Sequence, residues 1–446
     1  MPVELRTPDS SVADEFLPRV PDTVPEEWEA DFVRKREAIE RAVAEFPTPF
    51  YIYDERGIRN TVRNLNSAFD WADYRNHFAV KATPTPAIVD LMRQEGSGAD
   101  CSSAPEIVMA DALGIQGESI MFTSNHTSIA EYKLARDRGA IVNFDDLTHL
   151  NFYREHVGTF PDIVCLRYSP EGKAGNVIIG TPEEAKFGMS LPQLQEAYRQ
   201  LARAGVKRFG LHAMVASNEL EATYFAETAR MLLDATERIN DELGIDFEFV
   251  NIGGGFGIPY RPDQRPVDLS GVSELIEQEF ALSEAYGRPS LFTELGRYVT
   301  GPHGVLVTQV RHVEEKYRKV VGVDATMADL MRPGMYGAYH HITVLGGEYA
   351  PAETYDVAGS LCENNDKFAN QRPLPRVKHG DTLVIHDAGA HGRAMGFNYN
   401  GKLRCGELLL CEDGSIVEIR RDETVEDLFS TAHWPDGVEP DYTGLE

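Results

Sequence analysis

The chain has 446 residues, more than one hydrophobic core usually holds, so we expect two domains or one large barrel with an appendage. Hydrophobic residues make up 42% of the sequence, and no apolar run approaches the roughly 18 to 20 residues that a membrane-spanning helix needs. The 43 basic and 71 acidic residues give a formal net charge of −28, which argues against binding to nucleic acid or to an anionic membrane. An anionic ligand would need a local cluster of Arg or Lys.

Five cysteines are spread widely along the chain, and none forms a C-x-x-C pair. This spacing argues against a disulfide framework and against a structural zinc site, so we expect no metal. The N-terminal segment is polar and acidic, without the charged and then apolar pattern of a signal peptide. These features predict a protein of the reducing cytoplasm.

Short apolar runs alternate with longer segments of helical period from about residue 48 to residue 300. In the longer segments, such as PAIVDLMRQEG, apolar residues recur at spacings of three and four. This alternation predicts a (β/α)8 barrel of the TIM type, and a doubly wound open sheet is the competing prediction because periodicity cannot show closure. The apolar runs, which we expect to be strands, are FYIY (50–53), HFAV (77–80), GADC (98–101), IMF (120–122), IVNF (141–144), DIVCLRY (162–168), FGLHAMV (209–215), FEFVNI (247–252) and LFTEL (291–295).

The pattern changes after about residue 303, where strand-like runs such as GVLVTQVRHV, DTLVIHDAG and GELLLCE predominate. We therefore expect a barrel over residues 46–302 and a β-rich domain, of sandwich or barrel type, over residues 303–446. The first 45 residues contain one predicted helix, in PEEWEADFVRKREAIERAV, and we expect this extension to pack against the β-rich domain.

Lys81 directly follows the run HFAV, at the predicted end of a strand, which is where barrels of this kind carry their chemistry. Desolvation beside an apolar strand favours the uncharged amine, which can form an imine with a carbonyl group. A lysine that merely extends to the rim is the alternative interpretation.

Gly253, Gly254, Gly255 and Gly257 follow another predicted strand, in the segment FVNIGGGFGIPY. Consecutive glycines allow backbone N–H groups to approach an anion such as a phosphate. The spacing departs from the dinucleotide pattern G-x-G-x-x-G, and Pro259 disfavours the start of a helix, so we do not predict a dinucleotide site.

Glu294 and Arg297 end the last predicted barrel strand. A carboxylate there can keep a heteroaromatic nitrogen protonated, and a guanidinium can bind a phosphate or carboxylate in fork geometry, although a structural ion pair is the alternative. The β-rich part adds Cys362 and Glu363 in LCENND, a cysteine that could act as an acid or base in a cleft. Considered alone, such a cysteine is more often buried and inert.

Seven segments together resemble the fold-type III pyridoxal-phosphate-dependent decarboxylases, and most closely the diaminopimelate decarboxylase branch. The resemblance runs from about residue 46 to residue 410, and its segments occur in family order. They are HFAVKA, FGLHAMVAS, NIGGGFGIPY, ELGR, ADLMRPGMYGAYHH, LCENND and GAHGRAMGFNYN.

The resemblance implies a role for each matching residue. Lys81 would carry pyridoxal 5′-phosphate as a Schiff base, Glu294 would pair with the pyridine nitrogen, and Cys362 would be the proton donor. The other residues implied for the cofactor are Asp100, Glu106, Arg167, His212, Ser217, Gly254, Gly255, Gly296, Arg297 and Tyr399. The residues implied for an amino-acid substrate are Arg297, Arg332, Tyr336, Glu363 and Tyr399.

The resemblance also implies a homodimer, in which Cys362 and Glu363 complete the site of the second subunit. It predicts decarboxylation of meso-2,6-diaminopimelate to L-lysine, because a distal carboxylate calls for the guanidinium groups of Arg332 and Arg297. The ornithine branch of the family resembles Cys followed by Asp, where this chain has Cys362 followed by Glu363.

Four positions depart from the family pattern. Met214 replaces a usual histidine that stacks on the cofactor, Leu295 a usual proline, Asn364 a usual serine and His391 a usual aromatic residue. Because of these changes, a second hypothesis stays open: the protein is a related decarboxylase that acts on another diamino acid or on a siderophore or polyamine precursor. One further alternative is a barrel that carries the cofactor without turnover, but the second domain argues against it. Another is an amino-acid racemase, which needs an acid or base on each face of the cofactor, and no tyrosine in the motif set is placed for that role.

Overall fold

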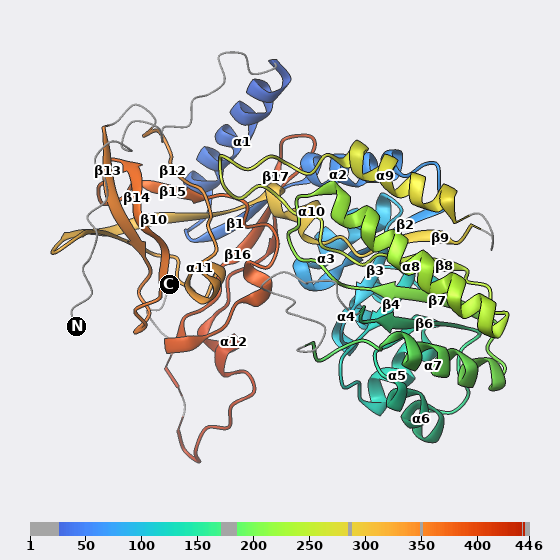
Figure 1. Ribbon diagram of the computed structural model, residues 1–446. Coiled ribbons are helices and arrows are strands. Elements are labelled where there is room, and N and C mark those ends of the chain that lie inside the picture. Colours follow the sequence, from blue (N-terminus) through green and yellow to red (C-terminus); the bar gives the residue numbers. More distant parts are fainter. Residues whose placement is uncertain (1–25, 171–184, 284–287, 348–350, 439, 442–446) are drawn as a thin grey trace, which may run out of the picture.

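The computed structural model describes residues 26–170, 185–283, 288–347, 351–438 and 440–441. It contains a barrel with surrounding helices and a separate β-sheet domain, which lie side by side in Figure 1.

The barrel is closed by eight parallel strands in sequential order. The last strand pairs with the first, with Tyr74 opposite Leu291 and Asn76 opposite Thr293, so the predicted (β/α)8 barrel is confirmed and the open sheet is excluded. Its strands are β2 (Tyr74–Ala79), β3 (Gly98–Cys101), β4 (Ile120–Thr123), β5 (Ile141–Phe144), β6 (Ile163–Tyr168), β7 (Arg208–Ala213), β8 (Phe249–Asn251) and β9 (Ser290–Thr293).

Amphipathic helices surround the strands. In α7 the buried residues Leu194, Ala197, Tyr198 and Leu201 recur at spacings of one, three and four, which places one apolar face of the helix against the barrel. The surrounding helices are α2 (Glu55–Ala68), α3 (Pro86–Gln94), α4 (Ala104–Ala112), α5 (Ile129–Asp137), α6 (Leu147–His156), α7 (Leu191–Arg203), α8 (Ala222–Leu243) and α9 (Leu269–Leu282).

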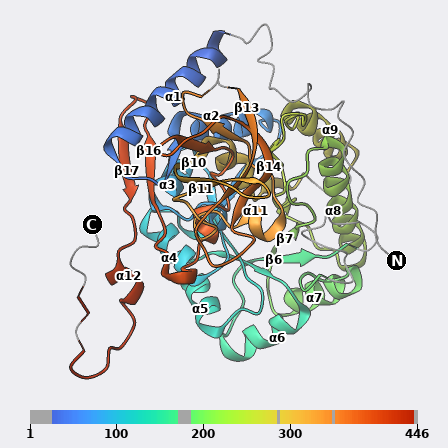
Figure 2. The ribbon, with the colours of Figure 1, turned by 90° about the vertical axis from the view of Figure 1, so that its left-hand side faces the viewer.

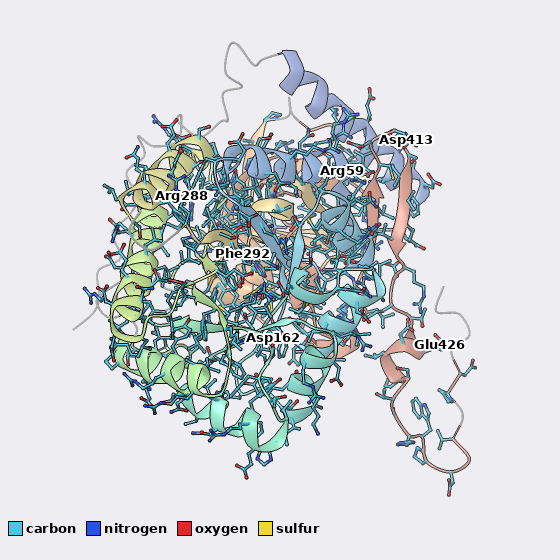
Figure 3. All side chains as sticks on the ribbon, turned by 90° about the vertical axis from the view of Figure 1, so that its right-hand side faces the viewer. Arg59, Asp162, Arg288, Phe292, Asp413 and Glu426 are labelled. Atoms are coloured by element: carbon cyan, nitrogen blue, oxygen red, sulfur yellow. The ribbon has the colours of Figure 1, made fainter. Side chains whose placement is uncertain are left out.

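Apolar and aromatic side chains fill the barrel interior. Figure 3 shows Phe292 near the centre of the ring of strands and helices, and its ring stacks on that of Phe249 with centroids 4.4 Å apart. Met121, Ile141 and Cys165 belong to the same cluster. The barrel is therefore a packed core, and chemistry is confined to the ends of its strands.

The β-sheet domain is a mixed nine-stranded sheet, in which β1 pairs with β16 in parallel and with β10 in antiparallel orientation. The run FYIY, which sequence periodicity places in the barrel, is strand β1 of this second sheet. All five residues of this strand are buried, as they would also be in a barrel strand, so the apolar pattern alone cannot distinguish the two sheets. The strands are β1 (Phe50–Asp54), β10 (Gly304–Glu315), β11 (Lys319–Val323), β12 (Ile342–Val344), β13 (Ala352–Ala358), β14 (Lys367–Pro375), β15 (Thr382–Ile385), β16 (Gly406–Leu410) and β17 (Ile416–Arg420).

Helix α1 (Glu26–Glu45) lies against this sheet, as Figure 2 shows. Its residues Ala38, Ile39 and Ala42 form a buried cluster with Ile52 and Leu408, among other residues of the sheet. Residues 1–25 of the N-terminal extension lie outside the described residues.

Besides several 3-10 helices, the described part of the chain contains three short α-helices, and α12 projects away from both domains in Figure 2. They are α10 (Arg297–Thr300), α11 (Arg332–Tyr336) and α12 (Val425–Phe429). None of the helices in the described ranges is both long and apolar enough to cross a membrane.

Replacement of Leu408 by alanine should test the packing of α1 on the sheet. Leu408 is 2% exposed, and its truncation should leave a cavity that lowers the free energy of unfolding by about 2 to 5 kcal/mol. Urea titration measures the change. Val417→Ala on the neighbouring strand is the control, because Val417 is 47% exposed and its truncation should change stability by less than about 0.5 kcal/mol. Equal losses of stability in the two variants would contradict the packing of α1 on Leu408.

Candidate active site

Polar side chains gather where the barrel strands end. Lys81 lies in the short 3-10 helix η1 (Val80–Ala82) after β2, and Asp100 lies on β3. His212 lies on β7, and Glu294 directly follows β9. The carboxyl ends of parallel strands meet at one edge, so strands far apart in the chain bring these residues together.

The amine of Lys81 lies 3.8 Å from Oδ2 of Asp100. The Lys81 side chain is 50% exposed, whereas that of Asp100 is 2% exposed, so the amine is accessible and the carboxylate is not. Burial, and then the nearby Glu294 carboxylate, raise the pKa of Asp100 well above its usual value. Its Oδ1 atom is buried and has no hydrogen-bond partner in the described part of the chain.

The loop after Lys81 is held by the β-sheet domain. The N–H of His391 donates to the Ala82 carbonyl over 2.8 Å, and the Thr83 hydroxyl donates to the Gly389 carbonyl over 2.7 Å. Thr85 donates to Oε2 of Glu407 over 2.8 Å. The second domain therefore fixes the backbone that carries the candidate reactive amine.

Glu294 is buried but ionised. Its Oε1 accepts a hydrogen bond from Asn251 over 2.8 Å, and its Oε2 lies 3.1 Å from Nε2 of His212. Burial alone would raise the pKa of Glu294, but His212, and then Lys81 and Arg167, lower it to about 2.

A second hydrogen bond sets the tautomer of His212. The side-chain nitrogen of Asn143 lies 2.9 Å from Nδ1 of His212 and donates to it, so Nε2 carries the hydrogen that is donated to Glu294. This chain of side chains keeps the Glu294 carboxylate fixed in position.

The glycine turn contacts both the Glu294 strand end and the loop after β7. A Cβ on Gly254 would lie well inside van der Waals contact with the Glu294 carbonyl oxygen, and one on Gly255 would collide with Ala216, next to Ser217. Gly255 also has a φ of +108°, which side-chain-bearing residues rarely adopt. The N–H of Gly254 donates to the sulfur of Met214 over 3.3 Å.

Two guanidinium groups meet at one tyrosine. Arg297 and Arg332 each donate Nη1 to the hydroxyl oxygen of Tyr260, over 2.6 Å and 2.8 Å. Arg332 is 7% exposed and also lies 3.1 Å from Nε2 of His340, whose Nδ1 donates to the His386 carbonyl. Within the described ranges no carboxylate pairs with either arginine, so this cluster is an uncompensated cationic site.

Three more of the predicted cofactor residues, Arg167, Glu106 and Gly296, belong to this end of the barrel. Arg167 is buried, lies 3.5 Å from Oδ1 of Asp145 and stacks on the ring of Phe187. Glu106 accepts from the N–H of Ser102 over 2.6 Å, and burial raises its pKa. Gly296 packs closely on the Lys81 loop, where a Cβ would meet that of Ala82.

A second group of predicted residues is exposed on the surface of the β-sheet domain. Cys362 and Glu363 are exposed, and the N–H of Cys362 donates to Oδ1 of Asn400, next to Tyr399. Tyr399 is 50% and Tyr336 60% exposed. In the described part of the chain, no hydrogen bond or ion pair joins Cys362, Glu363, Tyr336 or Tyr399 to Lys81 or Glu294.

Sequence reasoning missed Tyr260, His340, Asn251 and Asn143. Tyr260 ends the GIPY segment and Asn251 lies two residues before the first glycine, so their closeness to a predicted motif was an available signal. Nothing in the sequence marks Asn143, because a buried asparagine on a strand is recognised only by its partner across the barrel.

Comparison with known proteins identifies the family. Residues 55–301 match the model of the pyridoxal-dependent decarboxylase family, pyridoxal binding domain. The chain belongs to the pyridoxal-dependent decarboxylase family. It is 47% identical to Protein TabA of Pseudomonas amygdali pv. tabaci over 87% of this chain and 92% of that protein.

Members of this family with the name diaminopimelate decarboxylase are also similar. The protein of Methanothermobacter thermautotrophicus is 36% identical over 88% of this chain and 93% of its own length. The crystal structure of diaminopimelate decarboxylase from M. jannaschii with L-lysine superposes with a TM-score of 0.84, at 30% identity, over 89% of this chain and 94% of that chain.

The residues at the barrel mouth fit pyridoxal phosphate, the cofactor of this decarboxylase family. An accessible amine, a buried ionised carboxylate and a glycine turn are the three groups that an aldehyde, a protonated ring nitrogen and a phosphate require. Lys81, Glu294 and the turn at Gly254 provide them in this chain. The unpartnered Oδ1 of Asp100 offers a further acceptor.

Gly254→Ala should weaken cofactor binding. The added methyl group would push the turn away from the Glu294 carbonyl, so we expect the dissociation constant of pyridoxal phosphate to rise about tenfold or more, which corresponds to about 1.4 kcal/mol. Absorbance titration of the purified protein measures the constant. Gly322→Ala is the control, because its Cβ would meet only ordinary contacts at 3.8 Å. Unchanged binding in Gly254→Ala would count against the assignment.

Replacing His212 by asparagine should change how the free energy of unfolding depends on pH. The folded pKa of Glu294, about 2, lies below the ordinary value of 4.5, so its ionised form stabilises the fold above pH 4.5 and this stabilisation is lost as the pH falls toward 2. Without His212 the pKa of Glu294 should rise, because burial then dominates. The variant should then be less stable near pH 7 and regain part of that stability as the pH falls through the raised pKa, so its stability maximum moves to more acid pH.

Urea unfolding between pH 4 and pH 7 measures this shift, with bound cofactor followed by absorbance in parallel. The exposed His379, replaced by asparagine, is the matched control. Parallel pH profiles for His212→Asn and the wild-type protein would contradict the role given to His212.

Proposed function

We propose that the protein decarboxylates meso-2,6-diaminopimelate to L-lysine and carbon dioxide with pyridoxal 5′-phosphate. The observation that carries this proposal is the pair of guanidinium groups on Tyr260, which lacks a carboxylate partner in the described ranges. In a protein of net charge −28, two adjacent uncompensated arginines favour an anionic ligand group.

The position of this cluster supports a substrate with a second carboxylate. Arg297 directly follows Gly296, which packs on the Lys81 loop, so the cluster borders the candidate reactive amine. A substrate that ends in a simple amine, such as ornithine, needs no cation there. Diaminopimelate carries a carboxylate at each end, and one can bind the arginines while the other is lost.

Each residue at the barrel mouth has a task in this reaction. Bound pyridoxal phosphate supplies an electron sink for the bond that breaks. Lys81 would hold the cofactor through its amine, and Glu294 would keep the ring nitrogen protonated because its own carboxylate stays ionised. Arg297, Arg332 and Tyr260 would orient the substrate, which selects the bond to carbon dioxide over the bond to hydrogen.

The final step requires a proton at the substrate carbon, and we assign it to the thiol of Cys362. Cys362 and Glu363 are exposed in one chain, and so are Met335 and Tyr336 on α11. A homodimer in which this surface covers the barrel mouth of the second copy would bring the thiol to Lys81. Glu363 would then accept a hydrogen bond from the distal ammonium group. The reducing cytoplasm suits a free thiol in this role.

A related decarboxylase is the second candidate. The 47% identity to Protein TabA exceeds the 36% identity to the diaminopimelate decarboxylase of Methanothermobacter thermautotrophicus, which favours a neighbouring substrate such as another diamino acid or a siderophore or polyamine precursor. A panel of amino acids in competition with diaminopimelate separates the two.

Purified protein supplied with pyridoxal phosphate and meso-diaminopimelate should release carbon dioxide and L-lysine. Mass spectrometry identifies the product, and Lys81→Ala is the inactive control. Protein that holds the cofactor yet releases no carbon dioxide from this substrate, while it decarboxylates another diamino acid, would reject the first candidate in favour of the second.

Mixing two inactive variants should restore activity if sites are shared between subunits. Lys81→Ala and Cys362→Ala homodimers should each lose most activity. Heterodimers carry one intact site, so random exchange of equal amounts should recover about a quarter of the wild-type activity. In the control experiment, Cys411→Ala is used in place of Cys362→Ala, and this variant should be active before mixing. Absence of recovery, with exchange verified by native mass spectrometry, would exclude the shared site.

A further inference from the structure

Arg393 is a buried arginine without an ion-pair partner in the described part of the chain. It is 9% exposed and begins the short 3-10 helix η5 (Arg393–Met395) of the β-sheet domain. Its Nε donates to the Cys405 carbonyl over 2.8 Å. Among the described residues, neither of its two terminal nitrogens makes a hydrogen bond, and no carboxylate lies within ion-pair distance of the guanidinium group.

The carboxylate of Glu407 acts on Arg393 from a distance, but its hydrogen bonds are already used. Oε1 accepts from the Tyr53 hydroxyl over 2.8 Å. Oε2 accepts from the Thr85 hydroxyl, also over 2.8 Å, and from Nε of Arg420. Because Glu407 forms an ion pair with Arg420, its single charge is balanced before that of Arg393 is counted.

The other ionisable groups nearby leave the charge of Arg393 unbalanced as well. Arg404 forms an ion pair with Glu423. Asp329 accepts from two backbone N–H groups, and burial raises its pKa. Burial lowers the pKa of Arg393, and Glu407 raises it, but a guanidinium group stays protonated in proteins. One positive charge is therefore in excess at this place in the interior.

Arg393 lines a small cavity between the Lys81 loop and the β-sheet domain. The space open to the centre of a water-sized sphere is about 10 Å³, which is enough for one occupant of that size. Neither Lys81 nor Glu294 lines this cavity, so it is separate from the barrel mouth. Its walls include Ala82, Thr83, Thr85, Arg393, Glu407 and Arg420.

Charge and size together select the ligand. A buried charge without a partner is strongly unfavourable, so the occupant of the cavity should be negatively charged. The excess is one charge, which calls for a monovalent anion. The space admits one small occupant and is too small for phosphate or an organic acid. A halide ion meets these three conditions, and it accepts hydrogen bonds from any direction.

We propose that this cavity binds one chloride ion, held by the guanidinium groups of Arg393 and Arg420. Nη2 of Arg420 donates to the Pro84 carbonyl and to the Thr85 hydroxyl, each over 3.2 Å. The ion would therefore tie the β-sheet domain to the loop that carries Lys81. Because the site exists only in the folded chain, chloride should stabilise the protein by mass action.

Bromide tests the site directly, because it replaces chloride and is located by anomalous diffraction. Crystals of the cofactor-loaded wild-type protein, grown without halide and soaked in sodium bromide, should show an anomalous peak beside Arg393 and Arg420. A cavity that holds a water molecule and no bromide would overturn the proposal. This result does not depend on the folding of any variant.

Thermal unfolding tests whether the ion binds in solution. Sodium chloride replaces sodium gluconate, whose anion is too large for the cavity, at a constant ionic strength of about 0.3 M, so that general screening is unchanged. The Tm of the wild-type protein should rise by about 2 °C or more. Arg393→Gln removes the charge and should lose this rise. Arg203→Gln is the matched control, because Arg203 is exposed, and it should retain the rise.

Two outcomes of the thermal experiment would count against the site. An equal rise of Tm in folded Arg393→Gln would show that chloride acts elsewhere and would reject the role of Arg393. Bromide in the crystal without any rise of Tm in the wild-type protein would mean binding at crystal concentration only, which also overturns the proposal.

Discussion

The site depends on a carboxylate that stays ionised although it is buried. Removing Glu294 from water opposes its charge, and His212, with the Lys81 and Arg167 cations, reverses that effect. Asn251 adds a hydrogen bond to the other carboxylate oxygen. Asn143 in turn decides which nitrogen of His212 carries the hydrogen. Three side chains from three strands, β7, β8 and β5, thus support one charge. Closure of the barrel is what brings them together, so the fold and the electrostatics of the site cannot be separated.

The cationic cluster on Tyr260 has the opposite character. Arg297 and Arg332 share a hydroxyl oxygen without a balancing acid in the described part of the chain, an arrangement that costs stability until an anion arrives. His340 contributes an acceptor without adding charge, because its Nδ1 hydrogen is committed to the His386 carbonyl. The barrel supplies Arg297 and Tyr260, and the β-sheet domain supplies Arg332. The proposed substrate site therefore draws on both domains, as does the support of the Lys81 loop.

Sequence patterns predicted the closed barrel, the β-rich second domain and the family, because strand and helix periods and the motif order are local properties. They placed the run FYIY in the wrong sheet, since a fully buried strand has no alternation to reveal its partner. Lys81, Asp100, His212 and Glu294 were predicted as one site and do converge. The partnership of His212 with Glu294 and the bridge at Tyr260 were not predicted, because contacts across a barrel leave no spacing in the sequence. Tyr399, which was expected at the phosphate, is half-exposed and lies next to Asn400, the hydrogen-bond partner of Cys362, and its role stays a prediction.

The pairing of β1 has a consequence for how the chain is made. Tyr53 at the end of β1 faces Gly304 at the start of β10, so the whole barrel is an insertion between two neighbouring strands of the other sheet. During synthesis β1 leaves the ribosome first, but its partners β10 and β16 follow only after every barrel strand has emerged. The nascent barrel can close while β1 waits as an unpaired apolar strand, a state that exposes an aggregation-prone edge. Helix α1, which precedes β1 and packs on the same sheet, is available to shield it on the ribosome.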